Sequence, residues 1–220
     1  MIYFEEIGRL WSLLGEMLKG TLTTIEVWGF TLLVSLPLGL LFCLMYLSRN
    51  IVLRGIAKGY IFFFRGTPLM LQVILIFFGM PLLGLPIKDR VFAAIIAFTL
   101  NYAAYFAEIY RGGMQSIPKG QYEAANVLGL SSNVTFFKVI LPQVAKRILP
   151  PMGNEVINLV KDTALVYAIS ANDLMLEAKI AMLRDFSFIP LVIAAIFYLI
   201  MTGGLTSLFR RIERRFDYYK

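Results

Sequence analysis

The sequence predicts an all-α integral membrane protein with five transmembrane helices and an N-terminal interfacial helix. Of its residues, 59% are hydrophobic and only 16% are charged, whereas soluble domains have about 45–50% apolar and about 25% charged residues. The mean hydropathy is +0.73. The chain has 220 residues, a length typical of one domain. Because a spanning helix needs roughly 20 apolar residues, there is room for several spans with short loops.

Long apolar runs define the predicted spans. Residues 3–18 mix apolar and charged side chains, a pattern typical of an amphipathic helix in the membrane interface. A polar loop of residues 112–147 separates the third and fourth spans. The five spans lie near residues 21–47, 68–85, 91–109, 148–170 and 188–209.

The distribution of Lys and Arg predicts the orientation in the membrane. Most of these residues lie on one side, in the loops 48–66 and 110–147 and in the tail, which includes Lys220. Loops rich in Lys and Arg stay in the cytoplasm. We therefore expect an extracytoplasmic N-terminus, a cytoplasmic C-terminus and contacts with membrane lipid headgroups. Nucleic-acid binding is not expected, because the basic residues flank spans and form no patch of their own.

Several chemistries are disfavoured. Histidine is absent and Cys43 is the only cysteine, so an intrachain disulfide is excluded and a Cys/His metal site is not expected. No nucleophile–base set indicates an enzyme. The chain also has no G-x-x-x-x-G-K-[ST] run, the motif that cradles nucleotide phosphates. We expect no cofactor, and any ATP would be bound by a partner subunit.

The loop 112–147 has strong local signals. Residues 121–128 are good helix formers, and Gly129 is placed to close that helix in a left-handed conformation. The run Ser131-Ser132-Asn133 can cap a following helix, which Pro142 is expected to bend or end. The sequence thus predicts two short helices joined by a sharp bend.

Three groups in this loop, Glu123-Ala124-Ala125, Gly129 and Ile140-Leu141-Pro142, resemble the EAA signature of the permease subunits of bacterial binding-protein-dependent ABC importers. The resemblance implies the ABC importer permease fold in the bacterial inner membrane, with short cytoplasmic coupling helices that dock on a separate ATPase subunit. It assigns the docking to Glu123, Ala124, Ala125, Gly129, Leu141 and Pro142. A local cap or salt bridge remains the alternative role for Glu123.

Three shorter strings resemble the polar amino acid branch of that family. They are the run from Phe64 to Leu69 (FRGTPL), the run from Ala107 to Gly113 (AEIYRGG), and Gly153-Asn154-Glu155 followed by the run from Lys161 to Leu165 (KDTAL). This resemblance implies a polar amino acid substrate, an extracytoplasmic binding protein that delivers it, and a second permease subunit, identical or paralogous.

Polar residues within the third and fourth spans predict a substrate site. Ionisable groups inside a span cost roughly 2.5–3.5 kcal/mol each, so they face the bundle interior and pair or bind something. Glu155, Asn158 and Asp162 share one helix face, which Lys161 borders. We expect a site near mid-membrane lined by Asn101, Glu155, Asn158, Lys161 and Asp162. The alternative is that Lys161 and Asp162 pair with each other or with the second subunit.

Two further expectations concern helix geometry. Pro150, Pro151 and Gly153 are expected to loosen the start of the fourth span. Glu108 and Arg111 are expected to form a local ion pair or gate.

The expected function is therefore a permease subunit of an ATP-driven importer that works by alternating access. The alternative is an ion-coupled secondary amino acid transporter. It predicts inverted internal repeats, and no convincing repeat is present.

Overall fold

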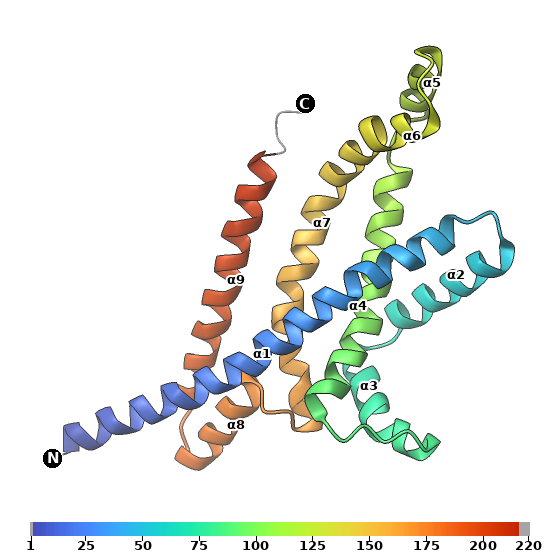
Figure 1. The fold of residues 1–220 in the computed structure, drawn as a ribbon. Helices are drawn as coiled ribbons and strands as arrows, with labels where there is room; N and C mark the ends of the chain where they lie inside the picture. Colours follow the sequence, from blue (N-terminus) through green and yellow to red (C-terminus); the bar gives the residue numbers. More distant parts are fainter. Residues whose placement is uncertain (1, 216–220) are drawn as a thin grey trace.

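The computed structural model describes residues 2–215, so Lys220 of the predicted basic tail lies outside the described residues. Every regular element within 2–215 is helical (Figure 1). The α-helices are α1 (Ile2–Leu47), α2 (Ile51–Gly66), α3 (Leu69–Ile74), α4 (Arg90–Gln115), α5 (Lys119–Val127), α6 (Ser132–Val134), α7 (Leu141–Asp162), α8 (Leu174–Asp185) and α9 (Ile189–Arg215). They are supplemented by π-helical turns at Leu75–Gly79 and Thr135–Ile140 and by 3-10 turns at Met80–Leu83 and Thr163–Ile169.

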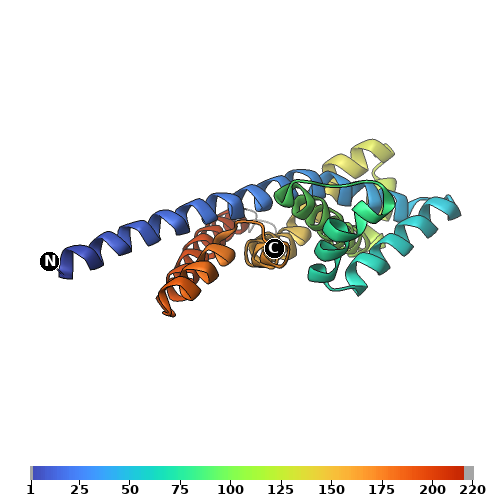
Figure 2. The same ribbon diagram turned by 90° about the horizontal axis from the view of Figure 1, so that it is seen from below.

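The predicted interfacial helix and first span form one continuous helix, α1, of 46 residues. No proline interrupts the junction near Gly20, and Gly20 lies directly on the backbone of α8: a Cβ there would come within 2.8 Å of the Leu174 Cα. Leu13 and Met17 pack against α8 and α9. The described part of this stretch is thus attached to the helical body, and the long diagonal course of α1 is visible in both views (Figures 1 and 2).

Residues 48–66, expected as a loop, are mostly helical and form α2. The chain then bends by 104° before the segment Leu69–Leu83. Pro68 lies at this bend, where its ring and missing N–H prevent the helix from continuing and push Thr67 into an extended conformation. The second predicted span is therefore short and joined to α2 as one bent pair.

Three helical stretches of the described chain are long and apolar enough to cross a membrane: Leu10–Leu47, Arg90–Gln115 and Ile189–Arg215. The bent pair at Pro68 raises this number to four if it forms one span. These stretches include the predicted first, third and fifth spans. The fourth predicted span corresponds to α7 and the 3-10 turn that follows it. This stretch is more polar than the other three, and its role as a span stays a prediction.

The centre of the protein is the contact between α1 and α4. Ala93, Ala97, Ala103 and Ala107 on α4 are fully buried. Small residues let helix backbones approach closely, which is how helices gain packing energy in a lipid environment. Gly39 of α1 completes this contact, since a Cβ there would lie 2.8 Å from the Cβ of Phe106 and 2.9 Å from the carbonyl oxygen of Ala103.

Pro150, Pro151 and Gly153 do not break the helix, and the expected loosening of its backbone hydrogen bonds stays a prediction. α7 stays helical through both prolines. Gly153 instead provides space for α9, because a Cβ there would lie 2.8 Å from the ring of Phe209. Trp28 of α1 donates a hydrogen bond of 3.0 Å to the carbonyl of Val156. These contacts hold α7 between α1 and α9.

A buried aspartate begins α8. Asp173 accepts hydrogen bonds from the N–H groups of Met175 and Leu176, and Thr24 of α1 accepts one from the N–H of Leu174. Burial raises the pKa of Asp173 to about 6, although these hydrogen bonds oppose the shift. Arg184 at the other end of α8 forms an ion pair of 2.8 Å with Glu16. The outer helix α8 is thus fixed to α1 at both ends.

The Gly39→Ala substitution should destabilise the protein. Its methyl group would overlap the backbone of α4, and overpacking of this kind costs typically 1–3 kcal/mol. Gly29→Ala, also in α1 but with no atom within 4 Å of the added Cβ, is the matched control and should be neutral or slightly stabilising. Thermal unfolding of the two purified variants in detergent measures the difference. Equal midpoints would contradict the proposed close contact.

Candidate functional site

The loop after α4 forms a compact turn with the predicted left-handed glycine. Gly129 has φ 71° and directly follows Leu128, the C-cap residue of α5. Its N–H donates to the carbonyl of Asn126, and the N–H of Leu130 donates to the carbonyl of Ala125, both at 3.0 Å. This pair of bonds is the Schellman arrangement that closes a helix C-terminus. The prediction for Gly129 is confirmed.

The second helix of the loop begins as predicted but does not end at Pro142. The Ser131 hydroxyl caps α6 by accepting a hydrogen bond from the Val134 N–H. The chain then continues through the π-helical turn Thr135–Ile140 directly into α7. Pro142 lies in the first turn of α7, directly after the π-helical turn, and the helical segment continues through it. The loop is therefore one short helix followed by a long helical segment.

We call residues 119–137 the docking turn; it protrudes from one end of the helical body (Figure 1). Glu123 and Ala124 are exposed, whereas Ala125 is buried. Among residues 2–215 Glu123 forms no ion pair within 4.0 Å. Large apolar side chains are also exposed here, with Val127 at 89% and Leu128 at 75%. An exposed apolar cluster on an otherwise polar loop marks an interaction surface.

A polar pocket of about 520 Å³ lies in the helical body where α2, α4 and α7 meet the bend at Pro68. It brings together four of the predicted substrate residues: Asn101, Glu155, Asn158 and Asp162. Lys161 is exposed and does not line it. The cation that lines the pocket is Arg65, which lies at the bend. It was not predicted as a site residue. Its place in the FRGTPL string, three residues before Pro68, was the available signal.

Asn101 has a structural task in this pocket. Its amide donates to the Phe64 carbonyl at 2.9 Å and to the Gln72 side-chain oxygen at 3.0 Å. Gln72 in turn donates to the carbonyls of Phe64 and Thr67 and to the Thr67 hydroxyl. Both amide residues are only 4% exposed. Together they satisfy the backbone carbonyls that the break at Pro68 leaves without helical partners.

Charged groups of both signs face the pocket. The Tyr102 hydroxyl donates to a carboxylate oxygen of Asp162 at 2.7 Å. The Arg65 guanidinium lies 5.3 Å from the centre of the Tyr105 ring and 3.8 Å from a carboxylate oxygen of Glu108. One guanidinium facing two carboxylates, Glu155 and Asp162, can hold a ligand that carries both a carboxylate and an ammonium group.

The predicted ion pair between Glu108 and Arg111 is present. The Arg111 Nε donates to Glu108 at 2.9 Å, and the guanidinium lies 5.2 Å from the centre of the Tyr46 ring. Glu108 therefore stands between Arg111 and Arg65. This chain of charges links the pocket to the end of α4 that leads into the docking turn.

The sequence of this chain matches a known family. The family described as "Binding-protein-dependent transport system inner membrane component" matches residues 35–218. The chain belongs to this family. Its match covers all three candidate site regions: the docking turn, the polar pocket and the charge chain.

Curated relatives have similar lengths. The chain is 37% identical over 201 residues to the arginine transport system permease protein ArtQ of Bacillus subtilis, covering 90% of this chain and 91% of that protein. It is 34% identical over 214 residues to a putative glutamine transport system permease protein, GlnP, of Rickettsia conorii, covering 96% and 98%.

Solved structures share the fold. A crystal structure described as an amino acid ABC transporter with histidines contains a chain that is 33% identical, with a TM-score of 0.87 over 94% of this chain and 97% of that one. The MetNI methionine ABC transporter, in an inward-facing conformation, has a chain with 21% identity and a TM-score of 0.69. At that identity the likeness concerns the fold alone.

The Gln72→Leu substitution should weaken the bend at Pro68. It would leave the Thr67 carbonyl without its side-chain donor and would remove one of the two hydrogen bonds made by the Asn101 amide and one of the two accepted by the Phe64 carbonyl. An unsatisfied buried group costs roughly 1–3 kcal/mol. We expect a lower midpoint of thermal unfolding in detergent. Gln115→Leu, at an exposed position at the end of α4, is the control and should change it little. A Gln72→Leu variant as stable as the wild type would refute the bracing role.

Proposed function

We propose that this chain is the permease subunit of an ATP-driven importer for a polar amino acid delivered by an extracytoplasmic binding protein. The observation that carries the proposal is the docking turn, which combines the EAA residues with a left-handed Gly129 and an exposed apolar cluster. The family membership and the amino acid permeases among its relatives support the same function.

Energy enters through the docking turn. A separate ATPase subunit binds Glu123, Ala124 and the exposed apolar side chains of the turn, and its closure moves the turn. From Ser132 the chain is helical through α6, the π-helical turn and α7 to Asp162. A single helical segment therefore joins the docked surface to the pocket residues on α7, so a rigid displacement at one end reorients the other.

The pocket recognises the two charged ends common to all amino acids. Arg65 binds the carboxylate, and Glu155 or Asp162 binds the ammonium group. Charge-assisted hydrogen bonds of this kind are strong and directional. Asn158 supplies a further polar contact, while Asn101 holds the bend that carries Arg65.

Leu141 and Pro142 lie at the base of the docking turn, where α7 begins.

A pair of permease subunits, identical or paralogous, encloses the path. The apolar helix α9 supports this arrangement, because only 6% of its most apolar stretch of 18 residues is buried within this chain. The docking turn and the C-terminal end of α9 lie at the same end of the molecule (Figure 1). This supports a cytoplasmic location for both, with the N-terminus on the opposite side of the bacterial inner membrane.

Altering the docking turn should release the ATPase. Gly129→Val places a β-branched residue at φ 71°, which such residues avoid, and Glu123→Arg reverses an exposed charge. We expect both variants to lose most of the ATPase that co-purifies with the wild-type permease. Gly120→Ala in α5, where nothing lies within 4 Å of the added Cβ, is the control. If both variants retained as much ATPase as the wild type, the coupling role of the docking turn would be contradicted.

Neutralising a pocket carboxylate should impair substrate uptake. Glu155→Gln removes one partner of the ammonium group, and the loss of a charged partner costs roughly 1.5–3 kcal/mol, or about tenfold to a hundredfold in apparent affinity. The measurement is uptake into proteoliposomes that contain the ATPase and the cognate binding protein. Glu177→Gln, at the start of α8 and outside the pocket, is the control. Unchanged affinity for every amino acid tested would remove Glu155 from the site.

A further inference from the structure

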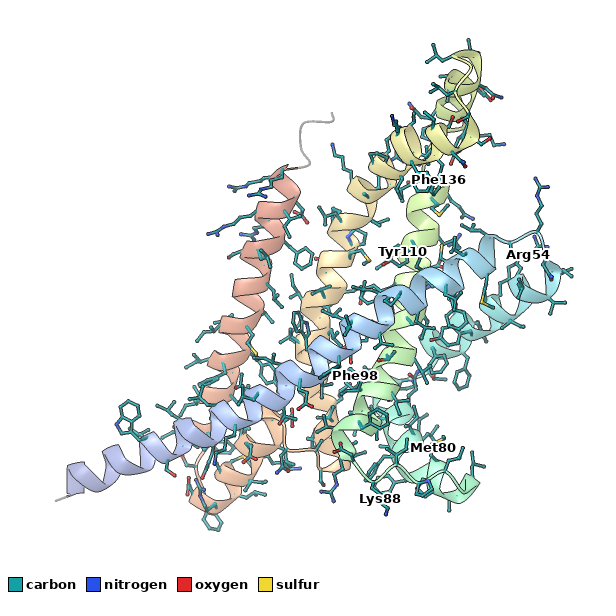
Figure 3. The ribbon with its side chains drawn as sticks, viewed as in Figure 1. Arg54, Met80, Lys88, Phe98, Tyr110 and Phe136 are labelled. Atoms are coloured by element: carbon teal, nitrogen blue, oxygen red, sulfur yellow. The ribbon has the colours of Figure 1, made fainter. Side chains whose placement is uncertain are left out.

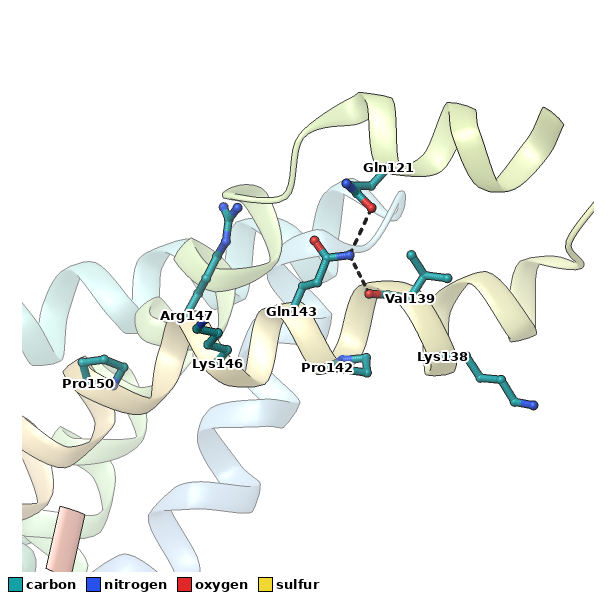
Figure 4. Close-up of a pocket in the computed structure, with 8 residues that line it drawn as sticks. All are labelled: Gln121, Lys138, Val139, Pro142, Gln143, Lys146, Arg147 and Pro150. Atoms are coloured by element: carbon teal, nitrogen blue, oxygen red, sulfur yellow. Dashed lines mark hydrogen bonds between the residues drawn. The ribbon is translucent and has the colours of Figure 1, made fainter. Parts of the chain in front are cut away.

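A second hollow, of about 590 Å³, lies at the base of the docking turn, where α5 approaches the start of α7 (Figure 4). It is separate from the polar pocket, since the two have no lining residue in common. Lys138, Lys146 and Arg147 line it, and no carboxylate does. We refer to it as the basic groove.

The basic groove follows two neighbouring rows of one helical segment. Lys138, Pro142, Lys146 and Pro150 succeed one another at intervals of four residues, and so form a continuous stripe. Arg147 belongs to the adjacent row. The two lysines are thus separated by roughly two helical turns, with a proline ring between them and another beyond. The stripe alternates cations with apolar rings.

The groove has a fixed cation at its inner end. Arg147 donates a hydrogen bond to the carbonyl of Ser116, at the C-terminal end of α4. Gln143 donates to the side chain of Gln121 on α5 at 3.2 Å and to the Val139 carbonyl at 2.8 Å (Figure 4). These bonds fix α5 and the end of α4 against α7, and they hold the Arg147 guanidinium at the groove.

The position of the groove suits a lipid headgroup. It lies between the protruding docking turn and the helical body, and the basic C-terminal end of α9 lies at the same end of the molecule (Figure 1). Basic pockets between membrane helices on the cytoplasmic side bind anionic lipid headgroups. The proline rings offer apolar surface for the glycerol and the first acyl carbons. A soluble anion would make no use of that surface.

We propose that the basic groove binds the phosphate headgroup of an anionic glycerophospholipid of the inner leaflet. The lipid phosphate lies between Lys138 and Lys146, and Arg147 closes the inner end. The bound headgroup spans the base of the docking turn, at the point where motion of the ATPase passes into α7. This assignment rests on the proposed cytoplasmic orientation of the docking turn.

The test measures phosphatidylglycerol binding to the assembled permease–ATPase complex by native mass spectrometry, with phosphatidylcholine as the neutral lipid. The Lys138→Gln/Lys146→Gln double variant should bind phosphatidylglycerol at least about tenfold more weakly than the wild type. Lys138→Glu alone, at an exposed position, should weaken binding to a similar degree by repulsion. Arg54→Gln, an exposed basic residue on α2 outside the groove (Figure 3), is the matched control and should bind as the wild type does.

Three results would overturn the proposal. The first is wild-type phosphatidylglycerol binding by both groove variants. The second is displacement of the lipid by millimolar inorganic phosphate, which would identify a site for free anions. The third is loss of the ATPase from the double variant with lipid binding intact, which would assign the groove to the ATPase interface. None of these results would contradict the proposed permease function, which is tested separately by the Glu123→Arg and Gly129→Val variants.

Discussion

A helix that breaks inside a membrane protein must find partners for the backbone groups it releases, because lipid supplies none. In this protein the break is at Pro68, and the partners are two buried side-chain amides, Gln72 and Asn101. The bend that they hold turns the end of α2 toward α4 and α7. The polar pocket exists because of this turn, and so does the placement of Arg65 opposite Glu155 and Asp162.

The second constraint is the continuity of the helical segment that begins at Ser132. Three prolines and a π-helical turn lie within it, yet the backbone stays helical to Asp162. Gly153 against Phe209 and Trp28 against Val156 hold this segment between α9 and α1. The second half of the docking turn, the α7 side of the basic groove and the α7 side of the polar pocket therefore lie on one continuous helical segment, with the proposed ATPase surface near one end and the proposed substrate residues toward the other.

Prediction from the sequence succeeded where a signal is local. The conformation of Gly129 follows from its place after a run of helix formers, and the ion pair of Glu108 with Arg111 follows from their spacing. It failed where packing overrides a local preference. Lys161 lies next to Asp162 in the chain, yet the helix turns it away from the pocket.

The sequence by itself determined the membrane class, the EAA turn with its left-handed glycine, and three of the pocket residues on α7, because hydropathy, turn chemistry and helical spacing are properties of neighbouring residues. Only the tertiary structure decided that Arg65 supplies the cation of the pocket, that Asn101 braces the bend, and that three basic residues share one groove with α5. These facts depend on where distant segments meet, which is set by the bend at Pro68 and by the close approach of α1 to α4 at Gly39.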